Sequence, residues 1–282
     1  MKRRIPEPIH PESAEREYQK FLMLYAKTYA RLVREGVTNT VPDLKKTAAI
    51  EQPRMDTNIE DKFKFLFNAV DAVMARLFPD YLLRKWVKVM IGGVNQNSKK
   101  NIGRQVKKAF KKSEEPPTFE PFMKDNHLSP YFQNIVDENV GLIRSITTMG
   151  IPALKNELVA LITADAPSKM ISDALRKHLS PEAGGKKVNV YARARLIAVD
   201  QVGKLNGALE QYRQEQLGLK RYRWRTSGDS RVRKDHRALE GRIFTWKNPP
   251  IVDKRTGRRA HPKRDFRCRC WAEPLLDDII DA

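Results

Sequence analysis

The sequence predicts an α+β protein with a mostly α-helical body and a small C-terminal domain that contains a few short strands and a short helix. Through most of the first 218 residues, apolar side chains recur at three- and four-residue steps, which is the spacing of an amphipathic helix. After Gly218 the pattern changes to alternation, with Tyr222 and Trp224 separated by single arginines, as in a strand with one buried face. We therefore expect a helical N-terminal region over residues 1–125, a helical middle region over 126–218 and a small basic α+β domain over 219–282.

The N-terminal region is expected to contain three helices that end at glycine or proline. The apolar pattern places them at residues 12–35, 63–77 and 81–91. Gly36, Pro79 and the pair Gly92-Gly93 are the expected stop signals. Residues 38–54 are polar and contain Pro42 and Pro53, so they are expected to form a linker.

A strongly basic segment follows at residues 99–112. It holds seven Lys and Arg residues and no acidic residue, while Ile102, Val106 and Phe110 supply an apolar stripe. This pattern predicts a basic amphipathic helix, whose charged face either contacts phosphates, an acidic protein or a membrane, or is simply solvated. Its candidate nucleic-acid contacts are Lys107, Lys108 and Lys111. The proline-rich residues 114–121 are expected to form a hinge.

The middle region is expected to be helical as far as Gly218. The predicted helices cover residues 130–149, 151–163, 168–178 and 190 to about 216. Residues 184–187, Gly-Gly-Lys-Lys, are expected to be a flexible break between the last two.

In the C-terminal domain, turn residues separate three expected strands and one short helix. Strands are predicted around residues 222–224, 242–246 and 266–271, with a tight turn at 253–257. Asp229 or Ser230 is expected to cap a short helix that carries His236 and stops at Gly241. Alternation along the third strand would place Cys268 and Cys270 on the same face as Phe266.

Two thiols on one face, with a histidine on a helix above them, form a candidate metal site. Cys268, Cys270 and His236 would supply three ligands, and Asp229 or His261 a fourth, a mixed set that suits a structural zinc ion. The alternative is that the cysteines are small buried apolar residues, that His236 belongs to a polar network and that Asp229 caps the helix.

The charge distribution points to a polyanionic partner. The chain has 54 Lys and Arg against 34 Asp and Glu, and residues 220–269 alone hold 18 against 5. Such a balance suits double-stranded DNA, although excess charge can also be a solvated surface. The aromatic residues of this domain are expected to form its core rather than to stack on bases. The candidate DNA contacts in this domain are Arg231, Arg233, Arg237, Arg258, Arg259, Lys263 and Arg264.

The apolar runs and the cysteine content argue against a membrane protein and against a disulfide-rich secreted protein. No stretch approaches the length of a membrane helix, and no apolar run follows the basic start, so neither a stable membrane span nor a secretory signal is expected. Two cysteines in 282 residues do not form a disulfide framework. A protein made in a cytoplasm fits best.

A series of spaced residues near the C-terminus resembles a known signature. It comprises Trp224, Thr226, Asp229, Val232-Arg233, His236, Gly241, Pro262 and Cys268-Arg269-Cys270. In this order and spacing it resembles the Mu-F-like family of phage head morphogenesis proteins, also called minor head or minor capsid proteins. Residues 139–146 and 192–198 look like the helical part of that family. Where many relatives have a Thr-Glu pair, this chain has Val199-Asp200-Gln201, so no role of that pair is carried over.

The resemblance implies a non-enzymatic minor head protein of a tailed phage or prophage. Such a protein acts in head assembly and in DNA packaging or delivery, contacts the portal or the major capsid protein, and resides in the head interior or portal region after assembly in the host cytoplasm. Two alternatives stay open. One is a metal-dependent nuclease with His236 as base and Asp229 as ligand; the other is a stand-alone nucleic-acid-binding protein.

Overall fold

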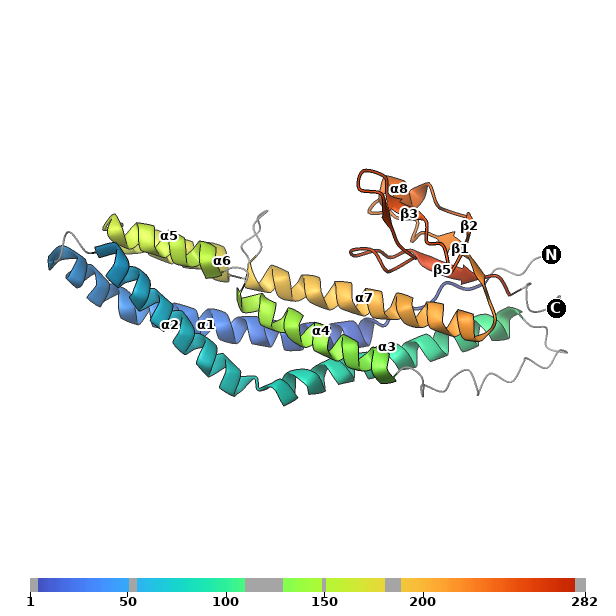
Figure 1. Ribbon diagram of the computed structural model, residues 1–282, viewed down its shortest axis with the longest axis horizontal. Helices are drawn as coiled ribbons and strands as arrows, with labels where there is room; N and C mark the ends of the chain where they lie inside the picture. Colours follow the sequence, from blue (N-terminus) through green and yellow to red (C-terminus); the bar gives the residue numbers. More distant parts are fainter. Residues whose placement is uncertain (1–4, 51–54, 110–128, 149–150, 181–188, 277–282) are drawn as a thin grey trace. The chain divides into compact units, whose positions relative to one another are not determined.

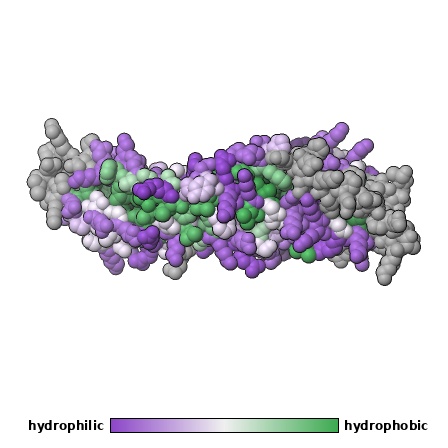
Figure 2. Space-filling model, turned by 90° about the horizontal axis from the view of Figure 1, so that it is seen from below, coloured by the Kyte–Doolittle hydropathy of each residue, from purple (hydrophilic) through white to green (hydrophobic). Residues whose placement is uncertain are grey.

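The computed structural model describes residues 5–50, 55–109, 129–148, 151–180 and 189–276. Helices dominate as far as Gln216, and the strands gather in the C-terminal part, drawn in orange to red in Figure 1, so the predicted α+β class is confirmed. Among the described residues, no helix is long and apolar enough to cross a membrane. Hydrophilic residues cover much of the face seen in Figure 2, as the charge content leads one to expect.

The chain divides into two compact units that are assembled from separate segments. One unit comprises Met1–Glu17, Lys88–Asn134 and Val199–Ala282, and the other comprises Tyr18–Val87 and Ile135–Ala198. The three regions predicted from the sequence are each one continuous segment, so they do not correspond to these two units. The predicted boundary after residue 125 lies outside the described residues, and these regional boundaries stay predictions.

The second unit, which we call the helical unit, is built from helices that bury a continuous apolar stripe. It takes residues from α1 (Glu12–Ile50), α2 (Met55–Leu77), α3 (Asp80–Ala109), α4 (Ser129–Thr148), α5 (Ile151–Thr163), α6 (Ser168–Leu179) and α7 (Val190–Gln216). Tyr18 and Tyr29 are both 1% exposed, and the Tyr18 hydroxyl donates to Asn139 Oδ1 at 3.0 Å. Phe21 stacks on Trp86 with ring centroids 5.1 Å apart. Each fully buried side chain of this kind contributes about 1.5–3 kcal/mol to stability.

The first helix is longer than predicted. α1 continues through Gly36 and Pro42 to Ile50, so the expected stop at Gly36 and the expected linker as far as Ile50 are wrong. Val37, Val41 and Leu44 extend the buried stripe, and this burial outweighs the poor helix propensity of glycine and proline. Gly36 serves packing instead, because a Cβ there would lie 3.1 Å from Leu66 Cδ1.

The third helix is also continuous where a break was predicted. α3 runs from Asp80 through Gly92-Gly93 and into the basic segment as far as Ala109. The helices predicted at residues 81–91 and 99–112 are therefore one helix over the described residues. A Cβ at Gly93 would lie 2.8 Å from Ala14 Cβ, which shows that glycine allows close approach here rather than ending the helix. The hinge predicted at residues 114–121 and the break at 184–187 lie outside the described residues. The stop at Pro79 and the four helices of the middle region are confirmed within one or two residues.

In the first unit, a small domain follows α7. Its antiparallel sheet has the order β2-β1-β5, with β1 (Arg221–Arg225) between β2 (Ile243–Thr245) and β5 (Trp271–Pro274). In this register Tyr222 faces Phe244 and Trp224 faces Ala272. A second pair, β3 (Ile251–Asp253) and β4 (Arg258–Arg259), flanks the predicted turn at 253–257 and was not predicted as strands.

The small domain has a core of its own. It contains the aromatic residues as predicted, together with both cysteines: Tyr222, Trp224, Leu239, Trp246, Val252, Cys268, Cys270 and Ala272. Gln214 on α7 donates to the Ala272 carbonyl at 2.9 Å, and Lys263 forms an ion pair with Glu210 on α7. The small domain is therefore fixed on the C-terminal half of α7 through polar contacts.

Candidate functional site

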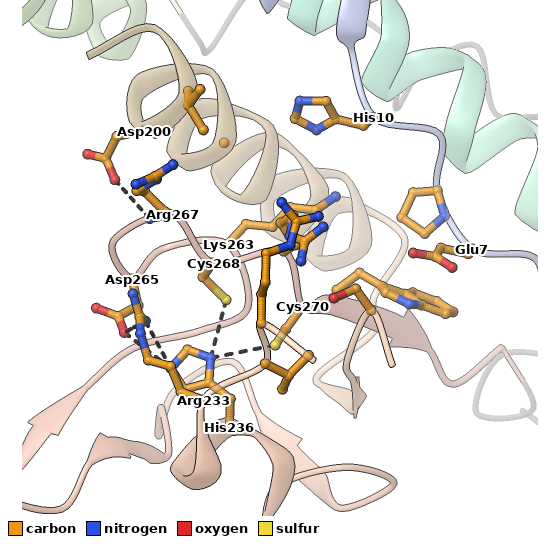
Figure 3. Close-up of a pocket in the computed structure, with 18 of the residues that line it drawn as sticks. Glu7, His10, Asp200, Arg233, His236, Lys263, Asp265, Arg267, Cys268 and Cys270 are labelled. Atoms are coloured by element: carbon orange, nitrogen blue, oxygen red, sulfur yellow. Dashed lines mark hydrogen bonds and ion pairs between the residues drawn. The ribbon is translucent and has the colours of Figure 1, made fainter. Parts of the chain in front are cut away.

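The site centres on His236, which the short helix α8 (Lys234–Arg237) holds against the loop before β5. Its Nδ1 atom lies 3.5 Å from Cys268 Sγ and 3.5 Å from Cys270 Sγ, as the dashed lines of Figure 3 show. The three ligand atoms lie within 4.8 Å of one another. His236, Cys268 and Cys270 are 2%, 9% and 3% exposed, and neither cysteine forms a disulfide. The structure thus brings together three of the four predicted metal ligands.

The other ring nitrogen of His236 faces a carboxylate that the sequence analysis did not single out. Nε2 lies 3.1 Å from Oδ2 of Asp265, whose side chain is 0% exposed. Arg233 and Arg258 pair with the same carboxylate at 2.7 and 3.0 Å. Two guanidinium groups therefore compensate the buried negative charge, which would otherwise be costly. The only signal in the sequence is an isolated acidic residue within a basic run.

This arrangement fixes the orientation of the imidazole. When Nε2–H donates to Asp265, the lone pair of Nδ1 is directed at the two sulfur atoms. Burial alone would lower the pKa of His236, but the interaction with Cys268 outweighs it and the pKa is raised. Hydrogen bonding to Cys270 lowers the pKa of the Cys268 thiol, assisted by His236, and the pKa of Cys270 is raised because its thiol donates to Cys268 and is buried. The cluster therefore favours one thiolate next to the imidazole.

The predicted third strand does not extend over the cysteines. The strand begins only at Trp271, and the preceding residues form turns in which Lys263 and Arg267 have φ values of 64° and 48°. Residues in this left-handed region cannot continue a strand. Cys268 and Cys270 are nevertheless both buried, whereas Phe266 is 54% exposed, so Phe266 does not share their environment.

Asp229 and His261, the predicted candidates for a fourth ligand, both lie outside the cluster. The Asp229 carboxylate accepts a hydrogen bond from the Arg231 backbone N–H at 2.9 Å and pairs with Arg269. It does not cap α8, whose N-cap is Arg233 and has no side-chain hydrogen bond. His261 Nδ1 instead forms a hydrogen bond with the Tyr222 hydroxyl at 2.9 Å.

A cavity of about 670 Å³ opens beside the cluster. Its walls include His236, Cys268 and Cys270, and also Glu7 and His10 of the N-terminal segment. That segment is held on α3, because Asn101 Oδ1 accepts from the Ile9 N–H at 2.9 Å and the Asn101 amide donates to the Ile9 carbonyl at 2.8 Å. Four exposed arginines also line the cavity: Arg231, Arg233, Arg267 and Arg269.

Asp200, which departs from the pattern that the sequence resembles, borders the same cavity. It accepts a hydrogen bond from the backbone N–H of Arg267 at 3.2 Å and pairs with Lys204 at 2.7 Å. It therefore holds the turn that precedes Cys268 against α7 (Figure 3).

Comparison with known proteins finds a family that is similar to the C-terminal part of the chain. The family model described as "Phage Mu protein F like protein" matches residues 155–273. Over these residues the chain is similar to that family. The predicted resemblance is thereby confirmed over a segment that includes α7, nearly all of the small domain and every residue of the cluster, which we call the Mu-F-like segment.

A curated relative adds no function. An uncharacterized protein of Haemophilus influenzae is 36% identical over 140 residues, which is 50% of this chain and 28% of that protein. The chain thus spans well under a third of that relative's length. No solved structure matches the chain significantly.

The predicted DNA contacts divide into exposed and paired side chains. Lys263 is 6% exposed and pairs with Glu210, so its predicted contact with DNA is not supported. Arg231, Arg233 and Arg258 are exposed but pair with Asp229 or Asp265. Arg237, Arg259 and Arg264, as well as Lys107 and Lys108 on α3, are exposed and form no ion pair within the described residues. Lys111 lies outside them.

The geometry does not suit the predicted nuclease roles either. A general base needs a ring nitrogen that can reach a water molecule. One nitrogen of His236 is bonded to Asp265 and the other faces two sulfur atoms, while Asp229 is held by Arg269. His236 and Asp229 therefore do not form a base and ligand pair.

Proposed function

We propose that this chain is a minor head protein of a tailed phage or prophage. It would act in head assembly and in DNA packaging or delivery without catalysing a reaction. Its place would be the head interior or the portal region of the virion, after assembly in the host cytoplasm. The match of residues 155–273 to Mu protein F supports head morphogenesis, and the contacts below are proposals for this chain.

The observation that carries the proposal is unpaired positive charge on the Mu-F-like segment. Eight exposed basic side chains of the small domain form no ion pair with a described carboxylate: Lys234, Arg237, Arg242, Lys247, Lys254, Arg255, Arg259 and Arg264. Charge that folding does not neutralise is available for phosphates, and its density favours double-stranded DNA, the polyanion that fills a phage head. Tyr222, Trp224 and Trp246 are buried in the core and so are not available for base stacking. Binding through the basic side chains alone is expected to be independent of sequence.

The helical unit offers a surface that suits a protein partner. On α2, Phe65, Val73 and Leu77 are 77%, 39% and 48% exposed. Their spacing of eight and four residues places them on one side of the helix. Exposed apolar side chains gathered in this way mark protein contact sites, which supports docking on the portal or the major capsid protein.

DNA binding is tested by charge reversal on the small domain. We expect Arg237→Glu and Arg264→Glu to weaken binding of a DNA duplex, measured by fluorescence anisotropy at several salt concentrations. Each lost phosphate contact should reduce the slope of log K against log salt by about 0.9. Lys27→Glu on α1 is the matched control, because it changes an exposed lysine of the helical unit by the same charge. Equal affinities and slopes for the three variants and the wild type would reject the small domain as the DNA contact.

The protein contact is tested by co-expression with the portal and major capsid proteins of the same phage. Phe65→Asp should reduce co-purification of one of them, whereas Lys27→Glu should not. Undiminished co-purification of both partners with Phe65→Asp would reject α2 as the docking surface.

A further inference from the structure

Three soft or borderline ligand atoms converge on a single point at the edge of the cavity. Around a tetrahedral zinc ion, with Zn–N near 2.0–2.1 Å and Zn–S near 2.3 Å, nitrogen and sulfur ligands stand about 3.5–3.6 Å apart. The distances from His236 Nδ1 to the two sulfur atoms are both 3.5 Å. Both distances match the spacing of ligands that share one ion.

The surroundings of His236 match the second requirement of a metal site. A histidine that binds a metal donates its other N–H to a carboxylate or carbonyl, which fixes the ring and raises its basicity. Asp265 accepts in that position at 3.1 Å, and Arg233 and Arg258 hold the carboxylate in turn. The Trp224 ring stands edge-on to the imidazole, with centroids 5.6 Å apart and an interplanar angle of 90°. The imidazole is thus oriented before any ion arrives.

The ligand count within the described residues leaves one position of a tetrahedron unfilled. Asp229 and His261 are engaged elsewhere, as described above, and no further His, Cys, Asp or Glu joins the three ligand atoms among the described residues. All three ligands line the cavity, so the unfilled position faces it.

We propose that His236, Cys268 and Cys270 bind one zinc ion whose fourth position is open to the cavity and holds exchangeable water or a small anion. Asp265 is a positioning residue for this site. The four arginines that line the cavity would favour an anion at the open position. Structural zinc sites are closed by four protein ligands, so an open position distinguishes this site from the closed site expected from the sequence. The proposal does not depend on the proposed function.

The first test is the metal content of the full chain, purified under reducing conditions and reconstituted with zinc. Elemental analysis should find about one zinc per chain. In wild-type protein both thiols should resist alkylation until the zinc is chelated, as mass spectrometry would show. A chain that takes up no zinc, or whose thiols react equally with and without it, would overturn the proposal.

Cobalt substitution then reports on the ligands and on the open position. The cobalt form should show thiolate-to-metal charge-transfer absorption and the visible bands of tetrahedral geometry, and added azide should shift the visible bands. A spectrum without thiolate character would overturn the ligand assignment, and a spectrum that azide leaves unchanged would overturn the open position.

Variants separate ligands from neighbours. Cys268→Ser, Cys270→Ser and His236→Ala should each lower zinc affinity, and circular dichroism of each variant controls for folding. Asp265→Asn should weaken zinc binding by about 10- to 100-fold while the cobalt spectrum keeps its thiolate band. Asp229→Asn is the matched control and should bind zinc as the wild type does; a loss as large as that of the cysteine variants would restore Asp229 as a ligand and contradict the open site.

Discussion

The helical unit and the small domain are stabilised by different kinds of contact. In the helical unit, buried apolar side chains follow one another at helical spacing over long segments, as from Tyr18 to Leu44 on α1. The small domain has strands of two to five residues, and three of its polar side chains, His236, Lys263 and Asp265, are buried. Burial of apolar area tolerates local irregularity, whereas a buried charge depends on its specific partners. The small domain should therefore respond more sharply to single substitutions.

The largest effect is expected at the ion pair that fixes the small domain on α7. Lys263→Met leaves the Glu210 carboxylate buried without its partner, and the expected loss is about 3–5 kcal/mol of unfolding free energy. Denaturant titration measures it. Lys234→Met, at an exposed lysine of the same domain, should change stability by less than about 0.5 kcal/mol. A loss at Lys263 no larger than that at Lys234 would show that the pair does not anchor the domain.

An effect of opposite sign is expected in the helical unit. Pro42 is exposed within α1, where a proline removes a helical hydrogen bond at a cost of up to about 3 kcal/mol. Pro42→Ala should therefore raise the free energy of unfolding by about 1–3 kcal/mol, measured by the same titration. A decrease would contradict a continuous helix through residue 42.

The smallest effect is a dependence on pH within the small domain. Burial lowers the pKa of His261 from 6.5 to about 4. Between these values the unfolded chain binds a proton that the folded chain does not, so the contribution of His261 to stability is lost as the pH falls from about 6.5 towards 4. His261→Gln should reduce the loss of stability over this window, measured by thermal melting at several pH values. Parallel melting curves for the two proteins would show that His261 titrates normally in the folded state.

The same contrast explains how much of the molecule could be predicted. Apolar periodicity located the helices and the stop at Pro79, because helix formation depends on neighbours three and four residues away. It failed at Gly36 and Gly93, where the contacts with Leu66 and Ala14 that decide the role of glycine are distant in the sequence. Intrinsic propensity was overridden there by tertiary packing.

For the site, residue type was more informative than position. Cys268, Cys270 and His236 could be grouped from their chemistry, and the structure brings them together. Asp229 was grouped with them for the same reason, but the turn at Gly228 directs it to Arg269. No sequence pattern identified Asp265, because its position next to His236 depends on a turn in which Lys263 and Arg267 adopt left-handed backbone conformations.

The measurement that tests the account most directly is hydrogen exchange along the whole chain, before and after chelation of zinc under reducing conditions. If the small domain depends on a metal that the helical unit does not need, amides of β1, α8 and β5 should lose protection after chelation, while those of α1 and α2 keep it. Unchanged protection in the small domain, or an equal loss in both regions, would contradict the account.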